Sequence, residues 1–177
     1  FTGASPIVSP LVSSTYTVAA SDGTCVNTTT VFLATDPVPT IAISVSASSV
    51  ICNGQSVTLS ATGGNNYTWT ASTGTFYTSS ITDSPTAPIS YQVKADNSFS
   101  CTSVNSQIVL VNPLPNVGAV ANKTLVCSGN PSTLTATGAN TYTWDSGVTT
   151  SVTVVNPTAP TVYTVTGTFT STQCQNT

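Results

Sequence analysis

The chain repeats itself at a spacing of about 75 residues, and this periodicity constrains its fold more than any other feature. The motif Tyr-Thr-Trp at residues 67–69 recurs at residues 142–144, and Cys52 recurs as Cys127. Cys25, Cys101 and Cys174 form a second series at nearly the same spacing. Copies of one structural unit along a chain build rods more often than active sites. Function is therefore expected to belong to the repeated unit rather than to single residues.

Aligning Tyr16, Tyr91 and Tyr163 sets the register and divides the chain into three segments. The first segment, residues 1–40, is predicted to be the C-terminal half of a unit. The middle segment, residues 41–115, is predicted to be complete, and the third segment, residues 116–177, to lack its last strand. Proline-rich motifs at residues 37–39 and 113–115 predict stiff linkers and an elongated array. We expect the chain to be a window from a longer secreted polypeptide.

The composition argues against catalysis. Charged residues make up 4% of the chain, against about 25% in an ordinary soluble domain. There is no His or Glu to act as a general acid or base, and no Ser–His–Asp triad can be built. The net charge of −3 disfavours nucleic acid and anionic membranes as partners. We predict a non-enzymatic protein without cofactor, metal or membrane insertion.

An all-β fold is predicted because Thr and Val are abundant and suit a pleated surface. Apolar and polar residues alternate over short stretches that are separated by Gly, Asn and Pro turns. Short strands at this spacing are typical of a β-sandwich. In the middle segment we expect strands at residues 41–45, 56–61, 67–70, 76–81, 89–95 and 107–111.

Each unit has an apolar set at the positions of an immunoglobulin core. Leu59, Trp69 and Val93 stand where the second-strand Cys, the third-strand Trp and the sixth-strand Cys would be. Tyr91 and Tyr163 each stand two residues before the last of these positions, as a tyrosine corner would. The predicted core residues are Leu59, Trp69, Tyr91, Val93, Leu134, Trp144, Tyr163 and Val165.

The motifs of the middle segment resemble a known class of repeat. They are Cys-Asn-Gly-Gln-Ser-Val-Thr-Leu at residues 52–59, Tyr-Thr-Trp at 67–69, Tyr-Gln-Val at 91–93, Cys101 and a terminal Val-Asn-Pro. The pattern is similar to the Ig-like or PKD-like repeats of very large secreted bacterial surface proteins, such as gliding-motility adhesins and other type IX secretion cargo. The resemblance implies tandem Ig-like sandwiches that serve as stalks, spacers or adhesive fibres.

The cysteines favour disulfides in an oxidising compartment, because no Cys-x-x-Cys pair or His is present for a zinc site. If residues 76–81 form one strand, Cys52 and Cys101 lie at the same end of the sandwich. This is because four strands, an even number, would then lie between them. Their position at one end favours pairing within a unit, Cys52 with Cys101 and Cys127 with Cys174. A further strand between residues 70 and 84 would reverse the argument. The alternative pairs neighbouring units, Cys25 with Cys52 and Cys101 with Cys127.

Two functions are weighed. The leading one is an extracellular, cell-surface structural or adhesive element whose partners are neighbouring copies of the same repeat protein. The alternative is an accessory module that binds surface glycans through the aromatic residues Phe76, Tyr77 and Phe99. Asp36, beside the first linker, is a weak calcium candidate, because its counterpart in the next copy is Asn112.

Overall fold

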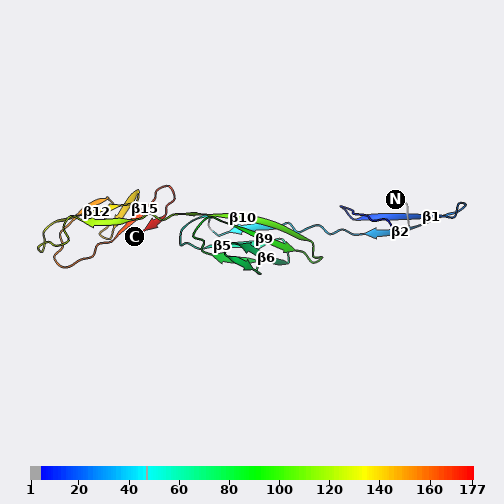
Figure 1. Cartoon of the computed structure of the whole chain (residues 1–177), viewed down its shortest axis with the longest axis horizontal. Helices are drawn as coiled ribbons and strands as arrows, with labels where there is room; N and C mark the ends of the chain where they lie inside the picture. Colours follow the sequence, from blue (N-terminus) through cyan, green and yellow to red (C-terminus); the bar gives the residue numbers. More distant parts are fainter. Residues whose placement is uncertain (1–4, 47) are drawn as a thin grey trace.

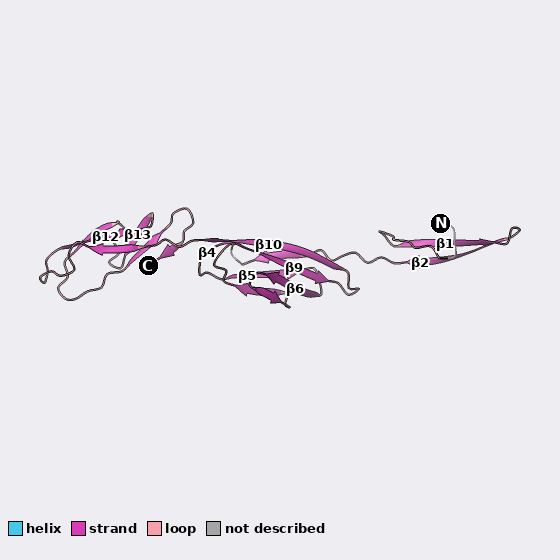
Figure 2. Cartoon of the chain, viewed as in Figure 1, coloured by secondary structure: helices cyan, strands magenta, loops and turns pink. Residues whose placement is uncertain are grey.

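The computed structural model describes residues 5–46 and 48–177, and in this part of the chain the fold is all-β with no helix (Figure 2). The all-β prediction is confirmed. The sheets follow one another along the long axis of the molecule, with the first segment at one end and the third at the other (Figure 1). The first segment holds β1 (Ser14–Ser21) and β2 (Val26–Leu33), which form an antiparallel hairpin.

Two sheets enclose a single core in the middle segment. One has the order β3-β5-β8 and the other the order β4-β10-β9-β6-β7, and only the β4–β10 pair is parallel among the registers described. Leu59, Trp69, Tyr91, Val93 and Val109 are fully buried between the sheets. The strands are β3 (Ala42–Val45), β4 (Val50–Cys52), β5 (Val57–Thr62), β6 (Asn66–Ala71), β7 (Gly74–Phe76), β8 (Ser80–Asp83), β9 (Ile89–Asp96) and β10 (Thr102–Asn112).

The third segment is built in the same way on a smaller scale. Its sheets have the orders β11-β12-β14 and β13-β15-β16. Leu134, Trp144 and Val165 are buried, and the half-buried Tyr163 packs against them. The strands are β11 (Gly118–Ala121), β12 (Ser132–Thr137), β13 (Thr141–Trp144), β14 (Val152–Val155), β15 (Val165–Thr168) and β16 (Gln175–Asn176).

The strands differ from the expected ones at three places. Residues 76–81 are not one strand: β7 pairs with β6 in one sheet, and β8 pairs with β5 in the other. The chain changes sheets at residues 77–79, and no Gly or Pro marks that crossing. The short strand β4 was not foreseen. The third segment also does contain the start of its last strand, because β16 pairs with β15 as β10 pairs with β9.

The two proline linkers are anchored to the sandwiches that follow them. Pro39 and Pro115 are both buried. Gly63 and Gly138 sit in tight turns at φ +95° and +90°, where a side chain is disfavoured. A Cβ on Gly138 would overlap the carbonyl of Asn116, just after the second linker, and a Cβ on Gly63 would overlap the equivalent carbonyl after the first. This close approach restricts bending where a linker enters its sandwich.

Candidate interaction surfaces

One disulfide joins two segments of the chain. Cys52 of the middle segment bonds to Cys174 of the third, with Cα atoms 5.5 Å apart and a sequence separation of 122. The predicted pairs Cys52–Cys101 and Cys127–Cys174 are therefore wrong. The alternative was right that a bond crosses a linker, but its partners, Cys25 with Cys52 and Cys101 with Cys127, are wrong as well.

Strand parity explains the error. Because β7 and β8 are separate strands, five strands lie between Cys52 and Cys101, and an odd number places these two cysteines at opposite ends of the sandwich. Cys52 pairs in register with Asn112, next to the second linker. Cys101 lies instead at the first linker, where its Sγ is 3.7 Å from the carbonyl oxygen of Asp36. Each end of the middle segment thus carries one cysteine.

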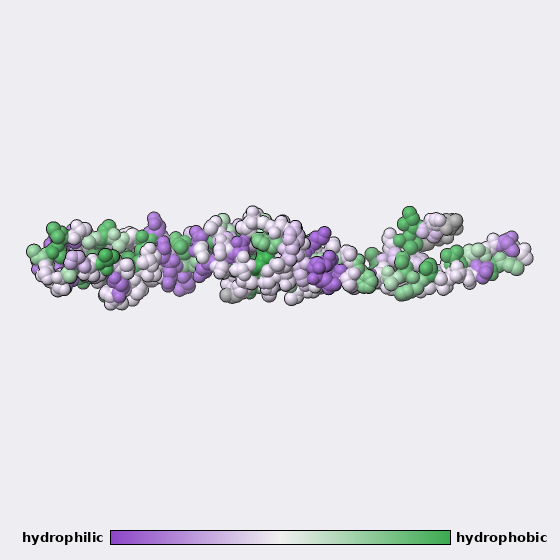
Figure 3. Space-filling model, turned by 90° about the horizontal axis from the view of Figure 1, so that it is seen from below, coloured by the Kyte–Doolittle hydropathy of each residue, from purple (hydrophilic) through white to green (hydrophobic). Residues whose placement is uncertain are grey.

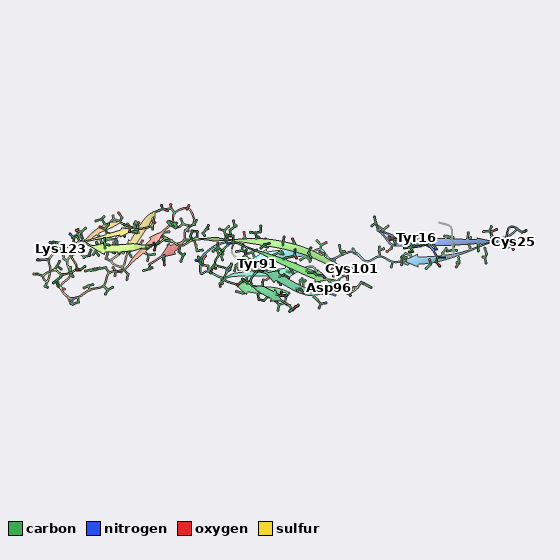
Figure 4. The ribbon with its side chains drawn as sticks, viewed as in Figure 1. Tyr16, Cys25, Tyr91, Asp96, Cys101 and Lys123 are labelled. Atoms are coloured by element: carbon green, nitrogen blue, oxygen red, sulfur yellow. A yellow bond between two sulfur atoms is a disulfide. The ribbon has the colours of Figure 1, made fainter. Side chains whose placement is uncertain are left out.

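The remaining cysteines are thiols, and they differ in exposure. Cys25 and Cys127 are exposed, and Cys101 is half-buried. Figure 4 shows Cys25 at the tip of the first segment and Cys101 near the junction between the first and middle segments. Cys174, in contrast, is fully buried in its disulfide.

Both junctions are also held by amide side chains. At the second junction, Asn176 Nδ2 donates to the carbonyl oxygen of Pro115 at 3.0 Å. At the first, Asn97 Nδ2 donates to the Asp36 carboxylate and, at 3.0 Å, to the Pro37 carbonyl. Asp36 is thus engaged by an amide, and residues 5–46 and 48–177 contain no group of three or more acidic, Cys or His side chains that could hold a metal ion.

An open hollow lies beside the disulfide at the second junction. It has a volume of about 290 Å³ and is lined by residues of both segments. Its walls are amide-rich, so the two segments meet through polar groups around a covalent bond. The lining residues are Cys52, Asn53, Gly54, Gln55, Leu114, Gln173 and Gln175.

An apolar face lies open on the β1–β2 hairpin. The register pairs Tyr16 with Val31 and Ser14 with Leu33, which places Tyr16, Val18, Val31 and Leu33 on one face. Val18, Val31 and Leu33 are 54%, 57% and 40% exposed. In the middle segment the corresponding face of β9 and β10 is covered by the opposite sheet. Figure 3 shows apolar residues at the surface of the first segment.

The predicted ligand-facing aromatics do not share one environment. Phe76 is half-buried and packs against the core of the middle segment. Tyr77 is 79% exposed just after β7, and Phe99 is 71% exposed in the loop between β9 and β10. Only Tyr77 and Phe99 therefore remain accessible to a ligand.

The half-buried carboxylate of Asp83 accepts hydrogen bonds from two hydroxyl groups and has a structural role. The Tyr91 hydroxyl donates to Asp83 Oδ2 at 2.7 Å, and Thr73 Oγ1 donates to the same oxygen at 2.8 Å. Burial alone would raise the pKa of Asp83, but these hydroxyls and the Ser84 N–H lower it below its usual value. Burial, and then the neighbouring carboxylate, raises the pKa of Tyr91 far above its ordinary value.

A paired-carboxylate site is not formed in the middle segment. Asp96 lies five residues beyond Tyr91 on β9, roughly 16 Å further along the strand. There Asp96 Oδ1 accepts a hydrogen bond from Asn66 Nδ2 at 2.8 Å. Asp83 and Asp96 thus serve opposite ends of the sandwich.

Comparison of the chain with protein-family models and with curated proteins finds no match. Among the residues that the structure describes, there is no helix of the length and hydrophobicity that a membrane span requires. The disulfide is compatible with an oxidising, extracellular setting.

Proposed function

We propose that the chain is a non-enzymatic, extracellular structural element: a stalk or surface-fibre region in which small Ig-like sandwiches follow one another. The observation that carries this proposal is the Cys52–Cys174 bond, which fastens one sandwich to the next at their facing ends. A bond of this kind joins two separate cores. It fixes their relative position, which is what a spacer under tension needs.

The surface supports association between copies. With 4% charged residues, neighbouring molecules repel one another weakly. Together with the resemblance to secreted bacterial surface repeats, this low charge favours cell-surface fibres as the setting.

Small-angle X-ray scattering tests the stalk. The oxidised chain is expected to scatter as a rod with one cross-sectional radius. A Cys52→Ala chain is expected to lose maximum dimension and gain flexibility at the second junction. Cys25→Ser, which changes an exposed thiol at the tip of the hairpin, is the matched control and should scatter like the parent. A compact, globular profile for the parent chain would refute the proposal.

The second candidate is a glycan-binding module, and the exposure of Tyr77 and Phe99 favours it, since accessible aromatic rings can stack on sugars. A glycan array with the parent chain, Tyr77→Ala, Phe99→Ala and the neighbouring control Thr75→Ala tests it. Binding that falls in both aromatic variants but not in the control would support this function. An array with no binding would remove it.

A further inference from the structure

Charged side chains are rare in this chain, and two of them lie together on one face of β9. The chain has two lysines and five aspartates. Lys94 and Asp96 are two residues apart on the strand, so they lie on the same face of the sheet with Cα atoms about 7 Å apart. This face is turned to solvent, because Val93 and Ala95, which alternate with them, are buried in the core. A cation and a carboxylate therefore stand side by side on the surface of the middle sandwich.

A polar hollow surrounds these two residues on the outer face of β6, β9 and β10. Its volume is about 180 Å³, and it is open to solvent. Lys94 pairs with Thr68 of β6. Asp96 pairs with Asn66 of β6 on one side and with Thr102 of β10 on the other. Within the width of three strands, the hollow thus offers an ammonium, a carboxylate, an amide and two hydroxyl groups. Figure 3 shows hydrophilic residues gathered at the end of the middle segment that faces the first segment.

The third sandwich shows that the fold does not require these charges. Its strands β13 and β15 pair in the same register as β6 and β9. At the four positions that correspond to Asn66, Thr68, Lys94 and Asp96, it carries threonine throughout. These threonines are Thr141, Thr143, Thr166 and Thr168. The charged and amide groups of the middle sandwich are therefore additions to a fold that forms without them, as the residues of a binding site are.

Asn66 and Asp96 hold each other in place. Asp96 Oδ1 accepts hydrogen bonds from Asn66 Nδ2 at 2.8 Å and from the Asn66 backbone N–H at 3.2 Å. Within residues 5–46 and 48–177, Asp96 Oδ2 and Asn66 Oδ1 accept no hydrogen bond from the protein. Two acceptors are therefore fixed in position and available. Groups that are ordered before a ligand arrives lose little entropy when they bind it.

Two exposed aromatic side chains flank the hollow. Phe76 of β7 pairs with Trp69 of β6. Because these strands are antiparallel, the next residue, Tyr77, is level with Thr68 at one side of the hollow. Phe99 lies at another side, in the loop that joins β9 to β10. Tyr77 and Phe99 are 79% and 71% exposed, so both rings are accessible to a ligand in the hollow.

The loop that carries Phe99 is held in one conformation by Asn97. Asn97 Oδ1 accepts hydrogen bonds from the N–H groups of Phe99 and Cys101, both at 3.0 Å. Asn97 Nδ2 donates to the Pro37 carbonyl of the first linker at 3.0 Å. An aromatic ring on a restrained loop supplies contact area at a small cost in conformational entropy.

We infer that this hollow and its two flanking rings form a binding site for a neutral glycan, with one hexose ring in the hollow. Sugar hydroxyls both donate and accept hydrogen bonds. The free oxygens of Asp96 and Asn66 accept from them, and the Lys94 ammonium donates to them. Tyr77 and Phe99 supply apolar contact for the C–H faces of the sugar. The positive and negative charges of the hollow cancel, which fits a neutral ligand better than an acidic one. The inference rests on the second candidate function and names its site and ligand class.

The test is an array of neutral hexose oligosaccharides and uronic-acid oligosaccharides, followed by titration with the neutral oligosaccharide that binds best. Lys94→Thr and Asp96→Thr give each position the residue of the third sandwich. Each should weaken binding about tenfold or more, because each removes charge-assisted hydrogen bonds. Lys123→Thr, which removes the other lysine, and Phe32→Ala, which removes an exposed ring of the first segment, are matched controls and should bind like the parent.

The fold of each variant is checked by urea unfolding, which should give the same midpoint as the parent. Lys94→Thr leaves the Asn66–Asp96 hydrogen bond in place, so it tests the site even if Asp96→Thr loosens Asn66.

The outcomes separate the site from the function. Neutral-glycan binding that falls in Tyr77→Ala and Phe99→Ala but is unchanged in Lys94→Thr would refute this site and leave glycan binding standing. Binding to uronic acids alone, lost when salt is raised, would overturn the neutral ligand class. An array with no binding would remove the second candidate function and this site with it, and a rod-like scattering profile would still leave the stalk standing.

Discussion

Removing the Cys52–Cys174 bond should destabilise the third segment far more than the middle one. The variant of choice is Cys52→Ala, because it alters a half-buried residue and leaves the fully buried Cys174 in place. Reduction of the parent chain removes the same bond without any substitution. The two perturbations should give the same result, and Cys101→Ala should leave the stability of the third segment unchanged.

The magnitude follows from where Cys52 sits. While the middle segment is folded, Cys52 is held beside Asn112 by the β4–β10 pairing. Unfolding of the third segment alone then leaves a closed loop that runs from Asn112 to Cys174, roughly 60 residues. In the chain-entropy account, closing such a loop is worth about 4 kcal/mol. For a segment of this size, that corresponds to a fall in Tm of about 15 °C or more.

Each segment has its own spectroscopic reporter, since Trp69 is buried in the middle segment and Trp144 in the third. Thermal unfolding followed by fluorescence in a Trp69→Phe background therefore reports the third segment, and a Trp144→Phe background reports the middle one. We expect the Tm of the third segment to fall and the Tm of the middle segment to change little. Equal shifts in both would show that the two sandwiches unfold as one, and no shift would show that the bond does not restrain the unfolded third segment.

Two further predictions concern positions inside the sandwiches. The pKa of Asp83 is lowered on folding, so its contribution to stability is present above its unfolded pKa and is lost as pH falls through the lower, folded value. Asp83→Asn should reduce the acid dependence of the urea midpoint between pH 6 and pH 2, and an unchanged slope would contradict this. Gly138→Ala should lower the free energy of unfolding, measured with urea, more than Gly129→Ala does. Both residues are at positive φ, but only Gly138 lies against a carbonyl. The Gly129 change should cost about 1–2 kcal/mol, and equal costs would refute the linker contact.

The sequence predicted the β-sandwich class and the buried residues because both depend on local pattern. Leu59 and Trp69 alternate with polar neighbours on β5 and β6, and alternation alone assigns them to the inner face. The copy at residues 132–144 repeats that alternation. The pattern was therefore sufficient to predict the core of both sandwiches.

The cysteine pairing could not be obtained in the same way. It depends on which end of a sandwich each cysteine reaches, and that depends on the number of strands between them. The crossing at residues 77–79 changes this number by one and has no Gly or Pro to mark it. A single undetected crossing therefore reversed the position of Cys101 relative to Cys52 and led to the wrong bond.

The bond also determines how the chain would carry tension. A pull applied to the two ends would pass from the first segment to Cys52, across the sulfurs to Cys174, and out. Residues 53–173 would lie outside this path, together with most strands of both sandwiches. About 400 Å of contour length would thus stay protected until the bond is reduced. When oxidised, the molecule would lengthen only through the residues before Cys52, and reduction would release the enclosed length as a long tether.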